Sequence, residues 1–247
     1  MWQGIYDELK DRNFTLISVA FDTGGVEAVR PFIRPAEPIE IAPPIADIMG
    51  WEMAEVKHAA MPAYPCLIDE QHIVAELYNM TNVPMAVWID ENGRIVRPAE
   101  AAGASDGFRS MDRATWAMPQ DLAARGKANR HRYVEAIRDW VVKGDKSEYV
   151  LSAAEAQSRI AAPTETDALA TANFRLGEYL RRIGHAADAV KYFTEARRLN
   201  PERWHYFRQT LELEETGKAS GPDFFAAVDA LGARPYYQPV ALKGSGK

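Results

Sequence analysis

Strand-forming segments occur only between residues 14 and 97 of this chain. Residues 14–21 (FTLISVAF) and 83–89 (VPMAVWI) are short apolar runs rich in β-branched and aromatic residues, and a shorter run covers 64–68. Amphipathic stretches with helical spacing separate these runs, and beyond residue 147 only helical patterns remain. Because strands that alternate with helices favour a largely parallel sheet covered by helices, the sequence predicts an α/β region followed by an all-α region.

The α/β region is expected to span residues 1–145. Its predicted elements, in chain order, are a helix at 2–12, a strand at 14–21, a helix capped by Asp22 and Thr23, an insertion at about 34–62, a strand at 64–68, a helix at 71–78, a hairpin turning at Asn92–Gly93, a loop at 98–128 and a helix at 129–143. Asn-Gly between apolar runs predicts a hairpin, because both residues tolerate positive φ. Five prolines punctuate the insertion, which favours an irregular surface segment.

Residues 146–247 are expected to form helices only. Ser152 and Glu155 have the spacing of a capping box. The predicted helices cover 152–161, 166–182, 186–199 and 202–216, and a last one runs from Gly221–Pro222 to about Gly232. Residues 170–203 resemble one tetratricopeptide repeat, because its signature positions are occupied by Leu176, Gly177, Gly184, Ala189, Phe193, Ala196 and Pro201.

A single repeat of this kind is not stable alone, because each repeat buries its apolar face against a neighbour. We therefore expect the helices to pack on one another and on the α/β region. The expected core residues of this part are aromatic: Trp204, Tyr206, Phe207, Phe224 and Phe225. The alternative is a peptide-binding groove, as in longer repeat arrays.

Composition narrows the classes of function. The chain has 29 basic and 35 acidic residues, which disfavours nucleic-acid binding because that depends largely on neutralising phosphates with Lys and Arg. No apolar run approaches the roughly 18 residues of a membrane helix, and the first ten residues lack a signal-peptide pattern. If Met1 is the true start, the expected location is the cytoplasm, with no nucleic-acid or membrane partner.

Three consecutive motifs carry a resemblance to a known family. They are Tyr64–Asp69 (YPCLID), Ala75–Tyr78 (AELY) and Asn82–Val96 (NVPMAVWIDENGRIV). With the element order around them, residues 1 to about 143 resemble thioredoxin-like redoxins of the alkyl hydroperoxide reductase and thiol-specific antioxidant type, which include selenoproteins. The resemblance implies a thioredoxin-like fold that lacks its first strand.

The resemblance assigns substrate binding to Val83 and Pro84. In the family the matching peptide bond is cis and lies beside the reactive cysteines. A cis proline turns the preceding backbone outward, so that its carbonyl and amide can pair with an extended substrate. The alternative is a trans proline that merely begins a strand, a position that proline tolerates.

The family's reactive residue has no counterpart in this sequence. It is a cysteine or selenocysteine at the start of the first helix, where the helix dipole lowers the pKa of the thiol. This chain begins inside that helix, and the family's central first strand would precede it. We therefore expect an N-terminally truncated reading frame, with a selenocysteine codon read as a stop as one specific hypothesis.

Cys66 is the only cysteine, so no disulfide forms within one chain. It is a weak candidate nucleophile, because it lies in an apolar strand and buried lone cysteines are usually inert. The five histidines show no metal-ligand spacing, and Asp22–Gly25 (DTGG) lacks a complete phosphate-binding motif. No metal or cofactor is expected.

Two functions follow from these observations. The first is a thiol-disulfide oxidoreductase or peroxidase-type redoxin, inactive as written and acting on a disulfide or peroxide once the segment with the reactive residue is restored. The second is a non-catalytic interaction protein that binds a protein partner through its thioredoxin fold and helical region.

Overall fold

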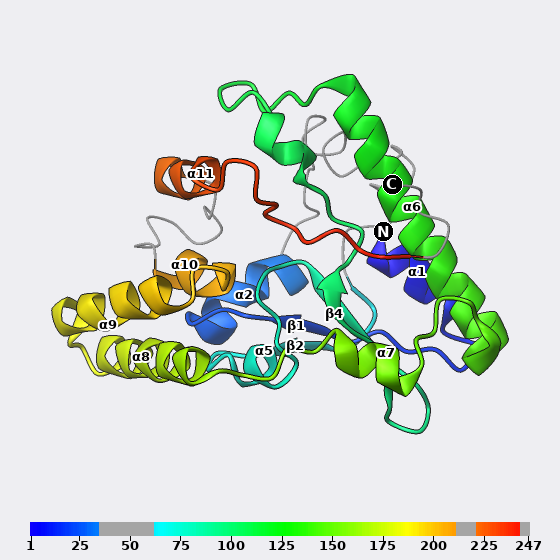
Figure 1. Cartoon of the computed structure of the whole chain (residues 1–247), viewed down its shortest axis with the longest axis horizontal. Helices are drawn as coiled ribbons and strands as arrows, with labels where there is room; N and C mark the ends of the chain where they lie inside the picture. Colours follow the sequence, from blue (N-terminus) through cyan, green and yellow to red (C-terminus); the bar gives the residue numbers. More distant parts are fainter. Residues whose placement is uncertain (35–61, 211–220, 243–247) are drawn as a thin grey trace.

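The computed structural model describes residues 1–34, 62–210 and 221–242. In these ranges helices surround two short pairs of strands (Figure 1), a mixed architecture compatible with the predicted α/β class. The predicted insertion at about 34–62 lies almost wholly outside the described residues, as do residues 211–216 of the helix expected at 202–216.

The elements follow the predicted order. They are α1 (Trp2–Leu9), β1 (Ser18–Ala20), α2 (Gly25–Ile33), β2 (Cys66–Ile68), α5 (Ile73–Leu77), β3 (Met85–Ile89), β4 (Ile95–Ala101), the 3-10 helix η1 (Asp106–Ser110), α6 (Gln120–Lys143), the 3-10 helix η2 (Gly144–Lys146), α7 (Ala153–Ser158), α8 (Glu165–Arg182), α9 (Ala186–Leu199), α10 (Trp204–Thr210) and α11 (Pro222–Asp229). Beyond β4 the described residues contain helices and connecting segments only, as the sequence predicts.

The strands form two separate pairs. β1 and β2 are parallel, with Ser18 opposite Cys66 and Ala20 opposite Ile68. β3 and β4 are antiparallel and joined by the predicted hairpin, where Gly93 has φ 75°. Within the described residues β1 pairs only with β2, and β3 only with β4, so both outer edges of each pair lack a neighbouring strand.

The prediction of a loop at residues 98–128 is wrong. β4 continues to Ala101, η1 lies within the segment, and α6 begins at Gln120 rather than at 129. Gly126 suggested a break, yet it is buried inside α6, and a Cβ there would meet Ser105 Oγ at 3.5 Å. Helix packing therefore outweighs the penalty of about 1 kcal/mol for a glycine in a helix.

The predicted cap of α2 is also wrong in detail. Its N-cap is Gly24, with no side-chain capping bond. Asp22 Oδ1 accepts a hydrogen bond from the Gly24 amide at 2.8 Å, which closes a turn before the helix. Thr23 instead bonds across the molecule, because its amide and hydroxyl both donate to Gln209 Oε1 at 2.9 Å.

The core of the α/β region lies between α1, α6 and the β3–β4 pair. Ile5 and Leu9 of α1 pack with Trp88 of β3 and with Tyr133 and Ile137 of α6. The indole Nε1 of Trp88 donates to the Tyr133 hydroxyl at 2.9 Å, which satisfies both polar groups in an apolar setting. This core fixes the start of α1 relative to β3.

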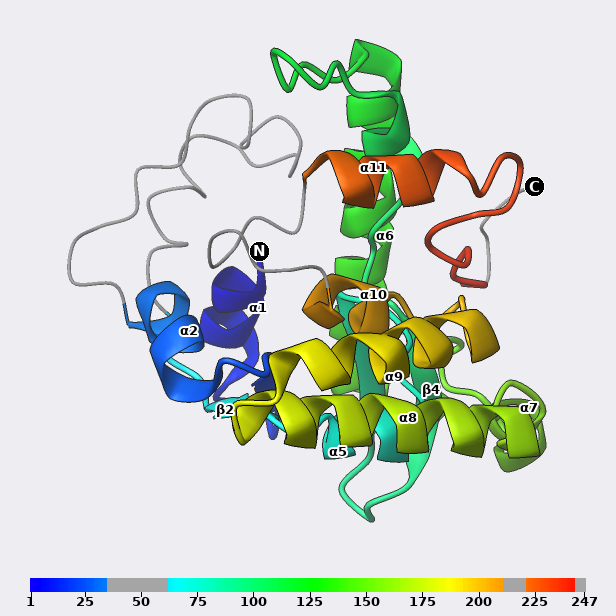
Figure 2. The ribbon, with the colours of Figure 1, turned by 90° about the vertical axis from the view of Figure 1, so that its left-hand side faces the viewer.

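The later helices pack on one another and on the α/β region. Consecutive helices α8 and α9 lie side by side (Figure 2), and a Cβ at Gly177 would come within 2.6 Å of the Phe193 ring, so only glycine permits this approach. The capping box of Ser152 and Glu155 is confirmed. The expected aromatic core is confirmed as well, with four residues buried and Phe207 partly buried: Trp204, Tyr206, Phe224 and Phe225.

Candidate functional site

A cavity of about 460 Å³ opens beside Pro84. Its lining is mainly apolar and comes from segments far apart in the sequence, among them Trp2 at the start of α1, Tyr64, Phe108 of η1, Arg130 of α6 and Tyr237 near the carboxyl end. A mostly apolar cavity with a few converging polar groups has the character of a ligand site, and its volume is in the usual range for small molecules.

Pro84 belongs to the lining of this cavity, and Val83 precedes it in the chain. Their peptide bond is cis, as the resemblance implies, and Pro84 is exposed and lines the cavity. The Val83 amide donates to Asn82 Oδ1 at 2.8 Å, and the Val83 carbonyl accepts from the Tyr237 hydroxyl at 2.8 Å. The Pro84 carbonyl accepts from the Ala102 amide at 3.3 Å. Both backbone groups of Val83 therefore have partners within the chain.

The segment around Tyr237 is held firmly. Asp106 accepts hydrogen bonds from the amides of Tyr236 and Tyr237, each at 2.8 Å, and Asn82 Nδ2 donates to the Tyr236 carbonyl at 3.2 Å. Tyr236 is only 4% exposed, in an aromatic cluster that includes Trp204. Burial raises the pKa of Tyr237, so its hydroxyl keeps the proton that it donates. The sequence reasoning missed this segment, which follows α11 and is red in Figure 1.

Cys66 is not part of the cavity. It is half-buried in β2, and its Sγ donates to the Tyr64 carbonyl at 3.5 Å. Tyr64 lines the cavity, whereas Cys66 does not. Because Cys66 is the only cysteine in the sequence, no thiol of this chain faces the cavity.

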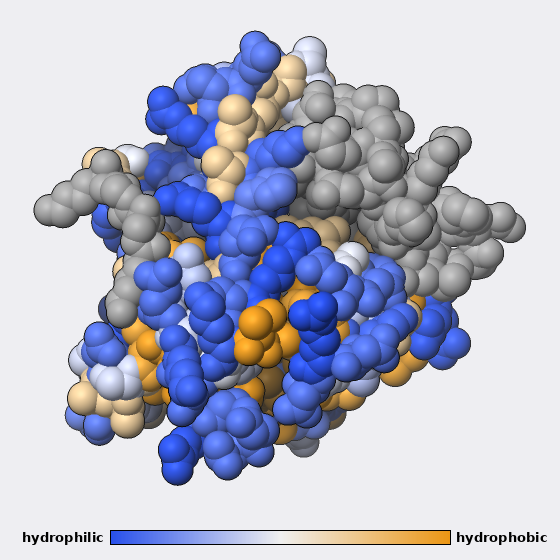
Figure 3. All heavy atoms as spheres, turned by 90° about the vertical axis from the view of Figure 1, so that its right-hand side faces the viewer, coloured by the Kyte–Doolittle hydropathy of each residue, from blue (hydrophilic) through white to orange (hydrophobic). Residues whose placement is uncertain are grey.

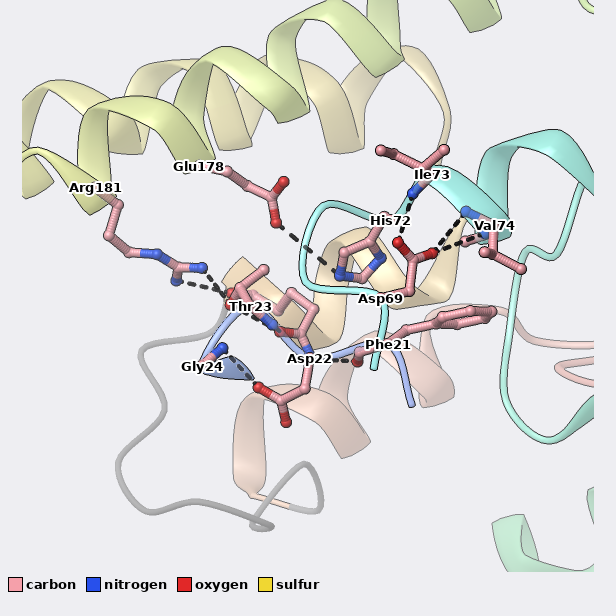
Figure 4. A network of polar contacts seen from close by, with 12 residues as sticks. Phe21, Asp22, Thr23, Gly24, Asp69, His72, Ile73, Val74, Glu178 and Arg181 are labelled. Atoms are coloured by element: carbon pink, nitrogen blue, oxygen red, sulfur yellow. Dashed lines mark hydrogen bonds and ion pairs between the residues drawn. The ribbon is translucent and has the colours of Figure 1, made fainter. Parts of the chain in front are cut away.

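A second, enclosed cluster of polar groups joins the two halves of the molecule (Figure 4). His72, at the start of α5, stacks on His205 of α10 with ring centroids 5.1 Å apart, and its Nε2 lies 4.0 Å from Glu178 Oε1 of α8. Both histidines are 3% exposed. Among the described residues neither ring nitrogen of His72, nor Nδ1 of His205, nor Glu178 Oε1 has a hydrogen-bond partner.

Burial sets the protonation of this cluster. It lowers the pKa of His72 to about 4 and raises the pKa of Glu178 to about 8, because each charged form would lose its hydration. The pKa of His205 is lowered in the same way, with a further contribution from His72. At neutral pH the histidines are therefore uncharged and Glu178 holds a proton.

Hydrogen bonds around the cluster fix its neighbours. The carboxyl group of Asp69 accepts from the amides of Ile73 at 2.9 Å, Val74 at 2.7 Å and Ala75 at 3.1 Å, and thereby caps α5. Arg181 Nη2 donates to Thr23 Oγ1 at 2.6 Å. None of these residues lines the cavity beside Pro84, so the cluster connects elements rather than meeting a ligand. No sequence signal marks it, because its members lie far apart along the chain.

In residues 1–34, 62–210 and 221–242 no group of three or more metal-ligating side chains could hold an ion. No helix in the same ranges is long and apolar enough to cross a membrane. The face in Figure 3 is mostly hydrophilic, with small hydrophobic areas. No family model, curated protein or solved structure matches this chain.

Proposed function

We propose that this chain is the greater part of a thioredoxin-like redoxin, a thiol-disulfide oxidoreductase or peroxidase, whose site is the cavity beside Pro84. One observation carries the proposal: the first residues of α1 and Pro84 line the same cavity. In the redoxins that the sequence resembles, the reactive cysteine or selenocysteine lies at the start of the first helix and faces the cis proline. The helix dipole at that end would stabilise a thiolate or selenolate.

The strand arrangement supports the same proposal. A strand inserted between β1 and β3 would join the two pairs into one sheet, in the order β2, β1, new strand, β3, β4. Each of the two described pairs has an edge without a strand neighbour, and unpaired backbone groups at an apolar edge are destabilising. We propose that this strand and the reactive residue after it are supplied by polypeptide outside the 247 residues.

The 247-residue chain by itself is then expected to be inactive in thiol chemistry. Disulfide exchange and peroxide reduction need a thiolate or selenolate in contact with the substrate. The cavity lacks a thiol of this chain, and Cys66 lies outside it.

The test compares this chain with a chain extended by the residues encoded immediately upstream of Met1 in the same frame. Each is assayed for reduction of a small aromatic disulfide and of cumene hydroperoxide with dithiothreitol as the electron donor. We expect turnover only from the extended chain, and loss of turnover when its added cysteine or selenocysteine is replaced by serine. An upstream sequence with neither a strand-forming segment nor a cysteine or selenocysteine would refute the proposal.

A second candidate is the non-catalytic interaction protein. The observation in its favour is that the Val83 backbone already has partners within the chain, so its pairing groups are not offered to a substrate. This function predicts a stable 247-residue chain that binds a protein partner and gains no activity on extension.

A further inference from the structure

The backbone at Val83 cannot receive an extended polypeptide in its present state. A peptide that adds to an edge as a strand forms hydrogen bonds with both the amide and the carbonyl of the receiving residue. Here the Val83 amide donates to Asn82 Oδ1 and the Val83 carbonyl accepts from the Tyr237 hydroxyl. Pro84 has no amide proton to offer, and its carbonyl accepts from Ala102.

The Tyr237 side chain is a fixed obstacle. Asp106 holds the amides of Tyr236 and Tyr237, and the Tyr236 ring is buried against Trp204 at a centroid distance of 4.5 Å. Phe108 lies at the edge of the Tyr237 ring, 6.0 Å between centroids. Displacing Tyr237 would therefore disturb two carboxylate hydrogen bonds and an aromatic cluster.

The space next to Tyr237 remains available. The cavity of about 460 Å³ is mainly apolar, and its lining includes the polar residues Gln3, Ser105 and Arg130. This volume accommodates a small molecule with one ring and a short polar substituent. An extended polypeptide would in addition need hydrogen bonds with the amide and the carbonyl of Val83.

We propose that Tyr237 determines the specificity of the cavity: it excludes extended polypeptides and leaves the cavity to small, largely apolar organic molecules. The substrate class rests on the proposed redoxin function and becomes small organic disulfides or hydroperoxides rather than disulfides in proteins. The exclusion of peptides is a property of the described residues and can be measured without any redox step.

The experiment uses the 247-residue chain and two probes. Cumyl alcohol, the unreactive alcohol corresponding to cumene hydroperoxide, is titrated while the amide resonances of Ala102, Ser105 and Gly126 are followed by NMR. A fluorescein-labelled peptide of alternating threonine and valine is titrated by fluorescence anisotropy. Each titration is repeated with Tyr237→Phe, which removes only the hydroxyl, with Tyr237→Ala, which opens the space, and with Tyr179→Phe as the control. Tyr179 is 49% exposed on α8 and does not line the cavity.

We expect cumyl alcohol to shift the three amides in the unchanged chain and in Tyr179→Phe with equal affinity. The peptide should bind Tyr237→Phe about tenfold more tightly than the unchanged chain, the effect of one hydrogen bond, and Tyr237→Ala more tightly still. Tyr179→Phe should change neither titration.

Equal peptide binding by the unchanged chain and Tyr237→Phe would overturn the inference, as would cumyl alcohol that shifts no cavity amide. If Tyr237→Ala does not fold, Tyr237→Phe decides the outcome. If the extended chain has no redox activity, the proposed function is refuted. If Tyr237→Phe nevertheless binds the peptide more tightly than the unchanged chain, the exclusion of peptides by Tyr237 still holds.

Discussion

The cavity beside Pro84 and the His72–His205–Glu178 cluster are two polar-containing regions with opposite relations to solvent. The cavity is mainly apolar and partly open to solvent, so water or a ligand can enter it. The cluster is closed, and several of its nitrogen and oxygen atoms lack hydrogen-bond partners among the described residues. The difference teaches that a strongly shifted pKa does not by itself indicate a functional site, because a reaction also needs access for a ligand.

The two regions also join different parts of the chain. The cavity brings the start of α1 together with the segment after α11, and the cluster brings α5 together with α8 and α10. We expect substitutions in the cluster to change stability more than binding, and substitutions at the cavity to do the reverse.

The largest expected effect is at Asp69, beside the cluster. Asp69→Ala leaves the buried amide of Ala75 and the partly buried amides of Ile73 and Val74 without their acceptor, and we expect it to lower the free energy of unfolding by about 3 kcal/mol. Urea denaturation monitored by circular dichroism measures the loss.

The matched control is Asp90→Ala. Asp90 accepts two amide hydrogen bonds, from Asn92 and Arg94, in the solvent-exposed hairpin turn. Water can replace its carboxyl group there, so the loss should be clearly smaller than for Asp69→Ala. Equal losses at the two positions would show that the cluster is not a closed region.

The second prediction concerns the pH dependence of stability. The pKa of His72 is 6.5 in the unfolded chain and about 4 in the folded chain, so the unfolded chain binds more protons between these values. Stability is therefore lost as the pH falls from about 6.5 to about 4. The pKa of His205 is also lowered on folding, which adds to this loss. The pKa of Glu178 rises from 4.5 unfolded to about 8 folded, so stability is lost as the pH rises toward 8. Below about pH 6.5 the two histidines destabilise the folded chain more, as the pH falls, than Glu178 stabilises it. The contribution of the cluster to the free energy of unfolding is therefore greatest at about pH 6.5.

Glu178→Gln tests this assignment. Glutamine keeps the size of the side chain and removes its titration, so the decline in stability between about pH 6.5 and 8, of about 2 kcal/mol, should flatten. Glu165→Gln, at an exposed position at the start of the same helix, should leave the decline unchanged. The midpoint of urea denaturation, measured at half-unit pH steps, distinguishes the two. An undiminished decline in Glu178→Gln would assign it to other groups.

Local patterns in the sequence predicted the helices and strands better than the contacts between distant segments. The hairpin at Asn92–Gly93, the capping box at Ser152 and the helix at Ala186–Leu199 each depend on residues close in sequence, and all three occur in the structure. The early start of α6 could not be predicted in this way. Gly126 locally favours a break in the helix, but packing next to Ser105, which lies outside the helix, keeps it helical.

The residues of the two sites also differ in whether neighbouring residues in the sequence could predict them. Val83 and Pro84 were predicted through a resemblance carried by consecutive motifs. Pro84 lines the cavity, and the Val83 carbonyl accepts a hydrogen bond from Tyr237, which also lines it. Tyr237 lies 154 residues further along the chain, and Glu178 and His205 are also distant in sequence from His72. Pairings of this kind arise only when the helices pack on the strands, so no local spacing reveals them.

The smallest expected effect on stability is at the cavity. Tyr237→Phe removes one hydrogen bond to the Val83 carbonyl, and water from the cavity can take the place of the hydroxyl, so we expect a loss of about 1 kcal/mol in the free energy of unfolding. Urea denaturation measures this loss in the same samples that are used for the binding titrations. A loss of about 3 kcal/mol, as large as that expected for Asp69→Ala, would mean that water cannot reach the Val83 carbonyl. The side of the cavity next to Tyr237 would then be as closed to water as the cluster, and the contrast between the two regions would fail there.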